Sequence, residues 1–434
     1  MVPCPRASVS PSERLGRAIG PGARYLQERA SGPWGAAQTV REPCATNFGM
    51  LRRIIMLTRL AADGSGYPKP LLRRCPFIQL VPALDGNSAF VPYTVVTRIR
   101  ICLASLCFSL IAGAAIAQQK PLPEHYDNPL GIGFEELKYP YPTAFLNLYV
   151  QGQDVRMSFM DVQPPKNPNG RTVVLLHGKN FWGAYWADTI KFLTDRGYRV
   201  VVPDQVGFGR SSKADLHYSF DFLAENTAGL LDLLQIPKAV IVGHSMGAML
   251  GIRFARLYPG RTEGLVLEGP LGLEDYRLAV PPSSLEQLYQ QELNVTLEDY
   301  RRYVQSYFVH YPPEKAEVFV EPRMRITLSG DFPRWARSAA LTDLMIYEQP
   351  VCYELAELKV PTLLIVGQED RTAFGKDRAP IDLRNTLGNV PELARKAATQ
   401  IPGAKIVELP NVGHIPHLEA PDQFHQALEG FLKR

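Results

Sequence analysis

Cysteine is nearly absent from most of this chain. Of its six cysteines, only Cys352 lies beyond residue 117. A single thiol cannot form an internal disulfide, so a disulfide-stapled fold is excluded for residues 118–434. A lone cysteine is more often a small buried apolar side chain than a nucleophile, and we expect a structural role for Cys352.

The sequence also lacks the common motifs of metal and cofactor chemistry. It contains no zinc-binding H-E-x-x-H, no phosphate-binding G-x-x-x-x-G-K-[ST] and no dinucleotide-binding G-x-G-x-x-G after a predicted strand. We therefore expect no cofactor and no metal ion.

Residues 118–434 carry no excess of positive charge. The formal charge of the chain is +4, but thirteen Arg and one Lys against five acidic residues give residues 1–117 a net charge of +9, which leaves −5 for the remainder. Nucleic-acid binding depends on clustered basic residues. The composition therefore predicts no nucleic-acid partner.

The first part of the chain differs in composition from the rest. Residues 1–93 are rich in Arg, Pro and Gly and show no sustained periodicity. This composition predicts an unstructured leader, or a stretch that precedes the true start of the protein.

A signal peptide is predicted over residues 94–117. Arg98 and Arg100 precede the apolar run 101–117, which ends in the small-residue pattern A-I-A. This order is typical of a segment that is cleaved on export, and it predicts a periplasmic or secreted product that begins at Gln118. If the run is not cleaved, a membrane anchor is the alternative.

Short apolar runs alternate with helical patterns through residues 118–434. The predicted buried strands are 172–176, 199–202, 239–242, 264–267, 362–366 and 405–409. An antiparallel hairpin over 149–162 precedes them. Strands that alternate with helices predict an α/β fold with a doubly wound, mostly parallel sheet covered on both faces.

The alternation stops over residues 270–350, where helical stretches replace it. An insertion between two strands of a parallel sheet lies over the carboxyl edge of the sheet. We therefore expect 270–350 to be a helical cap that divides the core into 118–269 and 351–434. Its many aromatic residues predict a partly apolar pocket. Four arginines of the cap are expected at the solvated surface: Arg323, Arg325, Arg334 and Arg337.

A strand, a sharp turn and a helix surround Ser245. The motif G-H-S-M-G occupies residues 243–247, directly after a predicted strand, and a helical pattern runs from Ala248 until Pro259. This arrangement is typical of a nucleophile elbow, because side chains at the two flanking glycines would collide with the strand or the helix. The helix N-terminus also directs backbone N–H groups toward developing negative charge. We interpret Ser245 as a nucleophile.

A serine hydroxyl needs a base to take its proton and a carboxylate to orient that base. Asp370 lies in a loop directly after a predicted strand and is the expected acid, with Glu369 and Glu268 as alternatives. His414 lies in a glycine-containing loop after the last predicted strand and is the expected base. His417 is expected to fix that loop.

Two backbone N–H groups are needed to hold an oxyanion. Met246 follows the nucleophile and should supply one, and Lys179 should supply the other, with Asn180 as the second choice. The remaining polar residues near these turns are expected to be structural: His177, Asp204 and His244.

Five motifs in this order resemble those of the α/β-hydrolase superfamily. They are HGKN, DQVGFGRS, GHSMG, GQED and NVGHIPHLE, each after an apolar strand, and the resemblance covers about residues 170–434. It implies a Ser245–Asp370–His414 triad and hydrolysis through an acyl-enzyme. The set is most similar to the esterases and meta-cleavage C–C hydrolases of the superfamily, whereas haloalkane dehalogenases and epoxide hydrolases use Asp as nucleophile.

The expected function is therefore that of a serine hydrolase acting on a small carboxylic ester with an apolar or aromatic group. Three alternatives stay open on the same residues. They are C–C bond hydrolysis, cofactor-free perhydrolase activity, and ligand binding without turnover.

Overall fold

The computed structural model describes residues 121–434. The predicted leader over 1–93, the predicted signal peptide over 94–117 and the expected start at Gln118 lie outside the described residues. Between residues 121 and 434, no helix is both long and apolar enough to cross a membrane.

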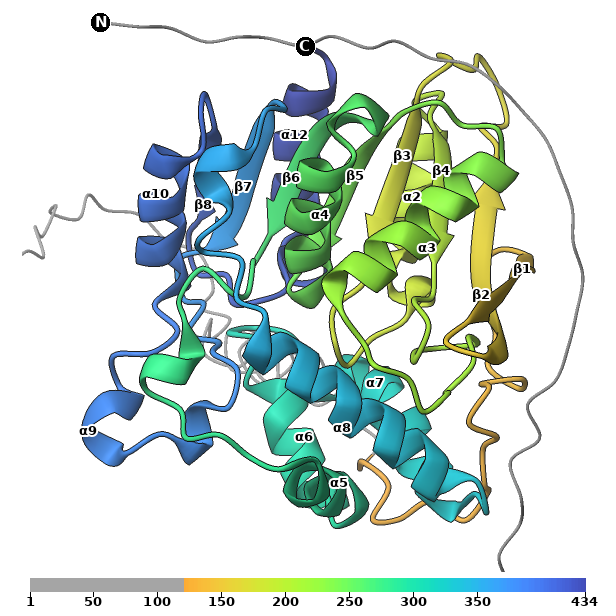
Figure 1. Cartoon of the computed structure of the whole chain (residues 1–434), viewed down its shortest axis with the longest axis vertical. Coiled ribbons are helices and arrows are strands. Elements are labelled where there is room, and N and C mark those ends of the chain that lie inside the picture. Colours follow the sequence, from red (N-terminus) through yellow and green to blue (C-terminus); the bar gives the residue numbers. More distant parts are fainter. Residues whose placement is uncertain (1–120) are drawn as a thin grey trace, which may run out of the picture. The chain divides into compact units, whose positions relative to one another are not determined.

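A single sheet of eight strands, in the order β1-β2-β4-β3-β5-β6-β7-β8, forms the centre of the described chain (Figure 1). Strand β2 pairs antiparallel with β1 and β4, and all the other pairs are parallel. The predicted α/β fold with a mostly parallel sheet is confirmed. The strands are β1 (Thr143–Val150), β2 (Gln153–Val162), β3 (Thr172–Leu176), β4 (Arg199–Pro203), β5 (Ala239–His244), β6 (Thr262–Glu268), β7 (Thr362–Gly367) and β8 (Lys405–Leu409).

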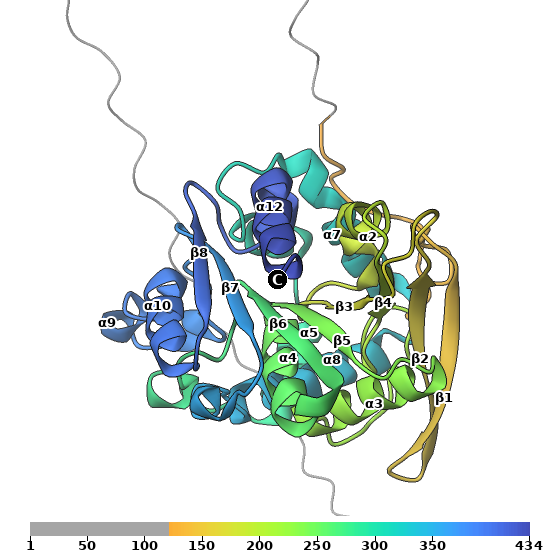
Figure 2. The same ribbon diagram turned by 90° about the horizontal axis from the view of Figure 1, so that it is seen from above.

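Helices cover both faces of this sheet, as Figure 2 shows in a view along the strands. The helices α3 (Phe220–Leu233), α4 (Met246–Leu257) and α10 (Val390–Gln400) pack on one face. The helices α2 (Ala187–Thr194) and α12 (Pro421–Leu432) pack on the other. Every residue of β3, β5 and β7 is buried, which explains why these strands are continuous apolar runs. The sequence interpretation did not include α10.

The antiparallel hairpin is longer than expected. Its turn is at Gln151 and Gly152, shorter than the expected turn over residues 151–154, because Gln153 and Asp154 already pair in β2. Strand β1 begins at Thr143 and pairs with β2 over its whole length. Strand β1 is at the sheet edge and is half exposed, so its apolar residues do not form the continuous run that marks the central strands.

Four helices follow β6 and precede β7, within the segment predicted to be a cap. They are α5 (Leu285–Leu293), α6 (Leu297–Gln305), α7 (Pro313–Arg325) and α8 (Phe332–Glu348), and they lie together beyond one end of the strands (Figure 1). Ser284 begins α5 with a capping box, and the Thr296 side chain accepts a hydrogen bond from the N–H of Asp299 at the start of α6.

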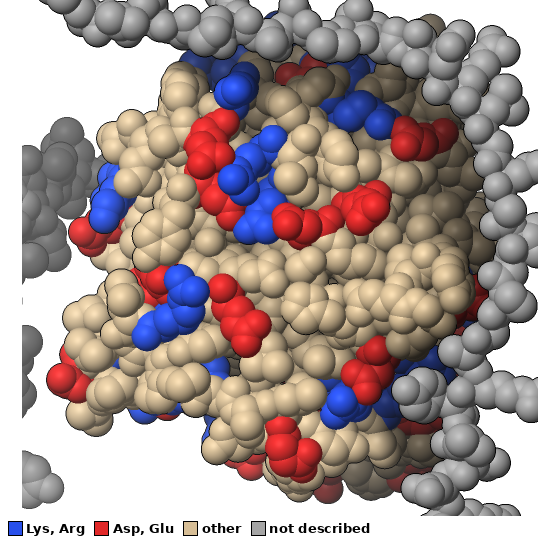
Figure 3. Space-filling model, viewed as in Figure 1, with Lys and Arg blue, Asp and Glu red and all other residues tan. Residues whose placement is uncertain are grey.

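Charged side chains of both signs lie next to one another on the face that α3 and α4 cover (Figure 3). Arg253 pairs with Asp221 of α3 and with Glu354, and Arg256 pairs with Glu357. No field of a single charge forms over these paired groups.

Candidate active site

Ser245 lies at the turn between β5 and α4 with φ 57° and ψ −116°. A non-glycine residue seldom has positive φ, and strain of this kind is concentrated at functional sites. A Cβ on Gly243 would lie 2.1 Å from the carbonyl oxygen of Gly247, and one on Gly247 would lie 2.3 Å from that of Leu176. Only glycine fits at either position, so the sequence interpretation of the turn agrees with its geometry.

Two loops that are distant in sequence bring His414 and Asp370 to this serine. Nε2 of His414 is 2.9 Å from Oγ of Ser245, and Nδ1 of His414 is 2.8 Å from Oδ2 of Asp370. All three residues are buried. A carboxylate can only accept, so Nδ1 carries the proton and Nε2 is left to accept the serine proton. The three predicted triad residues thus lie in the arrangement that proton transfer requires.

The two alternative acids lie elsewhere. Glu369 is exposed, 3.8 Å from the Arg371 guanidinium. Glu268 is buried and accepts hydrogen bonds from His417, at 2.7 Å from the backbone N–H and at 2.9 Å from Nδ1. The structure therefore places Asp370 against His414. The other oxygen of Asp370 accepts from the N–H of Thr372 at 2.9 Å, which fixes the carboxylate.

A hydrogen-bonded relay connects the loop after β3 to the histidine loop. The N–H of Gly178 donates to Oη of Tyr185 at 3.0 Å, and this hydroxyl is 3.0 Å from Nδ1 of His244. Nε2 of His244 is 3.1 Å from the carbonyl oxygen of His414. Burial, and then the nearby rings of His414 and His417, lower the pKa of His244 well below its usual value, so its imidazole is neutral and donates from Nε2.

The other residues expected to be structural also have internal partners. Nε2 of His177 accepts from the N–H of Gln205 at 3.0 Å, and burial lowers the pKa of His177. Asp204 accepts from the N–H groups of Gly183 and Arg210 at 2.7 and 2.9 Å. Cys352 is half-buried, and burial raises the pKa of its thiol, which makes it a poor nucleophile.

The expected oxyanion donors are the N–H groups of Met246 and Lys179. Met246 is the first residue of α4, where a backbone N–H has no partner inside the helix. Lys179 lies in the loop after β3, and it lines the same cavity as Ser245. Across residues 121–434, neither N–H group donates to another backbone carbonyl, so both are available to a ligand oxygen.

A cavity of about 670 Å³ has Ser245 in its wall. Aromatic side chains from the core and the cap form much of its lining: Phe181, Tyr300, Tyr303, Tyr307 and Phe374. The amide nitrogen of Asn180 donates to the hydroxyls of Tyr303 and Tyr307 at 3.1 and 3.0 Å. This polar role of the Asn180 side chain was not foreseen, because its tyrosine partners are more than a hundred residues away.

Charged groups also line this cavity, and several of them pair with one another. The ammonium of Lys179 lies 3.2 Å from Asp343 and 3.7 Å from Glu292, both on cap helices. Burial acts to lower the pKa of Lys179, but the charges of Asp343 and Glu292 outweigh burial and raise it. Burial raises the pKa of Asp343 to about 6, although the Lys179 charge opposes this. Four basic and four acidic side chains line the cavity in all, so its lining is close to neutral in formal charge.

The expectation of a solvated Arg323 is wrong. Its side chain is 5% exposed and donates to the carboxylate and the carbonyl oxygen of Glu292, each at 2.9 Å. Its guanidinium lies 4.5 Å from the centre of the Trp335 ring, with Tyr300 and Phe332 nearby. An ion pair and aromatic faces together offset the loss of water from the charge. The other three arginines are fully or partly exposed: Arg325, Arg334 and Arg337.

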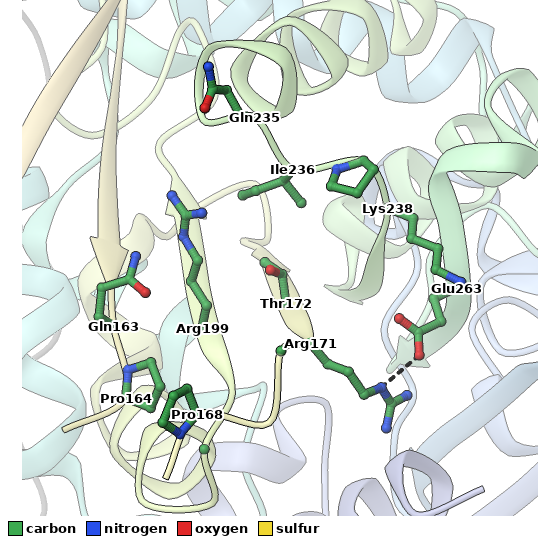
Figure 4. Close-up of a pocket in the computed structure, with 13 residues that line it drawn as sticks. Gln163, Pro164, Pro168, Arg171, Thr172, Arg199, Gln235, Ile236, Lys238 and Glu263 are labelled. Atoms are coloured by element: carbon green, nitrogen blue, oxygen red, sulfur yellow. Dashed lines mark hydrogen bonds and ion pairs between the residues drawn. The ribbon is translucent and has the colours of Figure 1, made fainter. Parts of the chain in front are cut away.

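A second cavity of about 450 Å³ lies at the amino-terminal ends of β3 and β4, and Figure 4 shows the residues that line it. Thr172 and Arg199, in its wall, are the first residues of β3 and β4. The guanidinium of Arg171 pairs with Glu263 across it at 2.6 Å. It contains none of the three triad residues. In the described part of the chain, no group of three or more His, Cys, Asp or Glu side chains is arranged to hold a metal ion.

Comparison with known proteins agrees with the observed fold. Residues 173–427 match the Alpha/beta hydrolase family, which is more than half of the chain. The chain is 25% identical to a 2-hydroxy-6-oxononadienedioate/2-hydroxy-6-oxononatrienedioate hydrolase of Burkholderia vietnamiensis, over 67% of this chain and 96% of that protein.

Solved structures give the same result. A probable hydrolytic enzyme from Pseudomonas aeruginosa PAO1 is 44% identical with a TM-score of 0.69, over 71% of this chain and 99% of that one. A thermophilic esterase from Thermogutta terrifontis is 25% identical with a TM-score of 0.51, over 67% of this chain and 98% of that one. With an eight-stranded, mostly parallel sheet and a serine at the turn after β5, the chain belongs to the α/β hydrolase family.

Proposed function

We propose that this chain is a serine hydrolase that cleaves a carboxylic ester of a small molecule through an acyl-enzyme. One observation carries the proposal. The hydrogen-bond chain from Asp370 through His414 to Ser245 is unbroken, and it ends in the wall of a cavity of about 670 Å³, which is a suitable size for a small ligand.

Acylation follows from these positions. Nε2 of His414 takes the proton of Ser245 as Oγ attacks the ester carbonyl, and the N–H groups of Met246 and Lys179 receive the negative oxygen. The imidazolium that forms is stabilised by the Asp370 carboxylate. It then returns the proton to the leaving alcohol as the C–O bond breaks, which leaves the acyl group on Oγ.

Deacylation repeats the sequence with water. His414 takes a proton from a water molecule that attacks the acyl carbonyl, and the tetrahedral intermediate uses the same two N–H groups. Collapse of the intermediate releases the carboxylic acid and returns the proton to Ser245. No group other than these residues and water is needed.

The cavity lining favours substrates with an aromatic or alkyl group. Phe181, Tyr300 and Phe374 supply apolar surface, whereas Lys179 is already paired with Asp343 and Glu292. Lys376 and Arg378 also line the cavity, and each donates to neutral oxygen atoms of the protein. A substrate carboxylate would have to displace a partner of whichever of these three cations it bound. We therefore expect a higher kcat/KM for a neutral ester than for a dicarboxylate monoester of equal length, and the reverse order would contradict this specificity.

Hydrolysis of a C–C bond is the second candidate. The relative from Burkholderia vietnamiensis is named for a 2-hydroxy-6-oxo-dienedioate substrate, and the match covers 96% of its length. Cleavage of a 2-hydroxy-6-oxo-dienoate can be monitored as a loss of the substrate's long-wavelength absorbance. A higher activity on this substrate than on every ester would favour the second candidate.

A panel of p-nitrophenyl esters of increasing acyl length tests the proposal directly. The purified protein should release p-nitrophenol, and Ser245→Ala should not. A fluorophosphonate probe should label Ser245. If folded protein is neither active nor labelled, ligand binding without turnover becomes the better explanation.

A further inference from the structure

Tyr307, two residues after the end of α6 in the cap, contacts both halves of the catalytic site. Its carbonyl oxygen accepts from the N–H of His414 at 2.7 Å. Its hydroxyl accepts from the amide of Asn180, the residue after the expected oxyanion donor, at 3.0 Å. Its ring centre lies 5.2 Å from that of His414. The cap therefore shares hydrogen bonds with the loop of the base and with the loop of the oxyanion donor.

Glu419 forms a second connection at the same place. One carboxylate oxygen accepts from the N–H groups of Val309 and His310 in the cap, each at 2.6 Å. The other oxygen accepts from the N–H of Gly413, beside the catalytic histidine, at 2.7 Å. Hydrogen bonds to an ionised carboxylate are shorter and stronger than neutral ones. A single side chain thus holds two cap amides and one amide of the histidine loop.

The backbones of the cap and this loop also approach each other closely. A Cβ on Gly413 would lie 2.3 Å from the carbonyl oxygen of Tyr307, which is a backbone atom that cannot rotate away. Glycine is therefore required at residue 413 for the His414–Tyr307 hydrogen bond to form. Neither the triad nor the oxyanion donors account for this requirement.

We propose that Glu419 is a positioning residue that fastens cap segment 307–310 to the histidine loop, so that the His414 imidazole is aligned with Ser245 while the cap is seated. This inference rests on the proposed function of Ser245 and His414. Glu419 touches no reacting atom. It acts through the backbone, because it holds Gly413, which precedes the base, and the cap segment whose Tyr307 accepts from the N–H of His414.

The alternative is that Glu419 only stabilises the fold. Three hydrogen bonds to a carboxylate contribute to stability wherever they lie. A stabilising role predicts a lower melting temperature and unchanged turnover for each folded molecule. A positioning role predicts a fall in kcat with little change in KM, because an error of about 1 Å in a catalytic group can reduce rate by about 100-fold.

The test compares Glu419→Ala and Glu419→Gln with Asp422→Asn, which alters an exposed carboxylate three residues away at the start of α12. Kinetics with a p-nitrophenyl ester are measured well below every melting temperature. We expect kcat to fall about 10- to 100-fold in Glu419→Ala, with KM changed by less than about threefold. Glu419→Gln keeps one acceptor oxygen and should lose less, and Asp422→Asn should resemble the wild type.

Amide hydrogen exchange supplies a readout that does not depend on activity. In Glu419→Ala, the amides of Val309, His310, Gly413 and His414 should all exchange faster than in the Asp422→Asn control. If the cap amides alone are affected, or if kcat is unchanged, the inference is wrong. If wild-type Ser245 is inert toward ester and probe, the proposed function fails, and exchange at His414 still decides whether Glu419 couples the two segments.

Discussion

The imidazole of His244 lies against the backbone of the catalytic histidine, with Nε2 3.1 Å from the carbonyl oxygen of His414. His244 directly precedes the nucleophile, so this contact joins the turn of Ser245 to the loop of its base. On the other side, Tyr185 connects His244 to the N–H of Gly178. The nucleophile, the base and the loop of the oxyanion donor therefore share one buried network.

Tyr185→Phe should destabilise the protein by about 1–3 kcal/mol, because it removes one hydroxyl and leaves the N–H of Gly178 and Nδ1 of His244 without their partner in the interior. Chemical denaturation should show a lower midpoint with an unchanged slope. Tyr149→Phe, at an exposed site, is the control. Equal stability of Tyr185→Phe and the wild type would show that the relay contributes nothing.

Ser245→Ala should reduce kcat on p-nitrophenyl esters by about 10⁴- to 10⁶-fold, because no other group is placed to form the acyl-enzyme. His414→Ala should cost nearly as much, since the serine proton then has no acceptor. The double variant should be little worse than either single one, because the residues act as a unit. Full activity in Ser245→Ala would defeat the proposed mechanism.

The two buried carboxylates should differ in their effects. Asp370→Asn should lower kcat about 10⁴-fold, because the tautomer of the His414 imidazole is no longer fixed. The same variant should leave the free energy of unfolding nearly unchanged. Glu268→Gln weakens the hydrogen bonds to His417 instead, and it should lower stability more than kcat. Kinetics and denaturation of both variants separate these roles. If Glu268→Gln is inactive while Asp370→Asn is fully active, the acid of the triad is Glu268 and not Asp370.

His425 should contribute to loss of stability in acid. Its ring stacks on Phe192 at 4.2 Å, and Nε2 lies 3.1 Å from the Thr189 hydroxyl. Burial lowers the pKa of His425 from 6.5 to about 4. The unfolded chain therefore binds more protons between these values, and the free energy of unfolding falls as pH decreases from 6.5 to about 4.

Between pH 7 and pH 4.5, His425→Gln should lose about 1–2 kcal/mol less of its free energy of unfolding than the wild type does. This range allows for partial access of solvent to the imidazole. Denaturation curves at pH 7 and pH 4.5 measure it, with the exposed His217→Gln as control. An unchanged difference between the two pH values would exclude His425 as a source of the effect.

We also propose that the protein is exported and cleaved after Ala117. The apolar run 101–117 after Arg98 and Arg100 supports this, and it lies outside the described residues. N-terminal sequencing of protein isolated from its native source should begin at Gln118. Native protein that begins at Met1 would contradict both the export and the proposed start.

Local sequence determined the strands, the turn at Ser245 and the order of the triad residues. A central parallel strand is buried on both faces and must be apolar, so β3, β5 and β7 are visible as continuous runs. The glycine at 243 is fixed by a backbone contact within the turn itself, and the glycine at 247 by the end of β3. Strand β1 is half exposed and has no continuous apolar run, so it begins earlier than its sequence pattern suggested.

Only the tertiary structure decided which acid faces His414 and where the charges of the cap lie. Asp370 follows β7 and Glu268 ends β6, and the sequence cannot tell which of the two the loop of His414 approaches. Arg323 was expected in solvent because an isolated guanidinium is costly to bury, but its partner Glu292 comes from another helix. Contacts between distant segments depend on how helices pack, and a local pattern carries no record of that packing. The same holds for Glu419, whose carboxylate meets cap amides more than a hundred residues away.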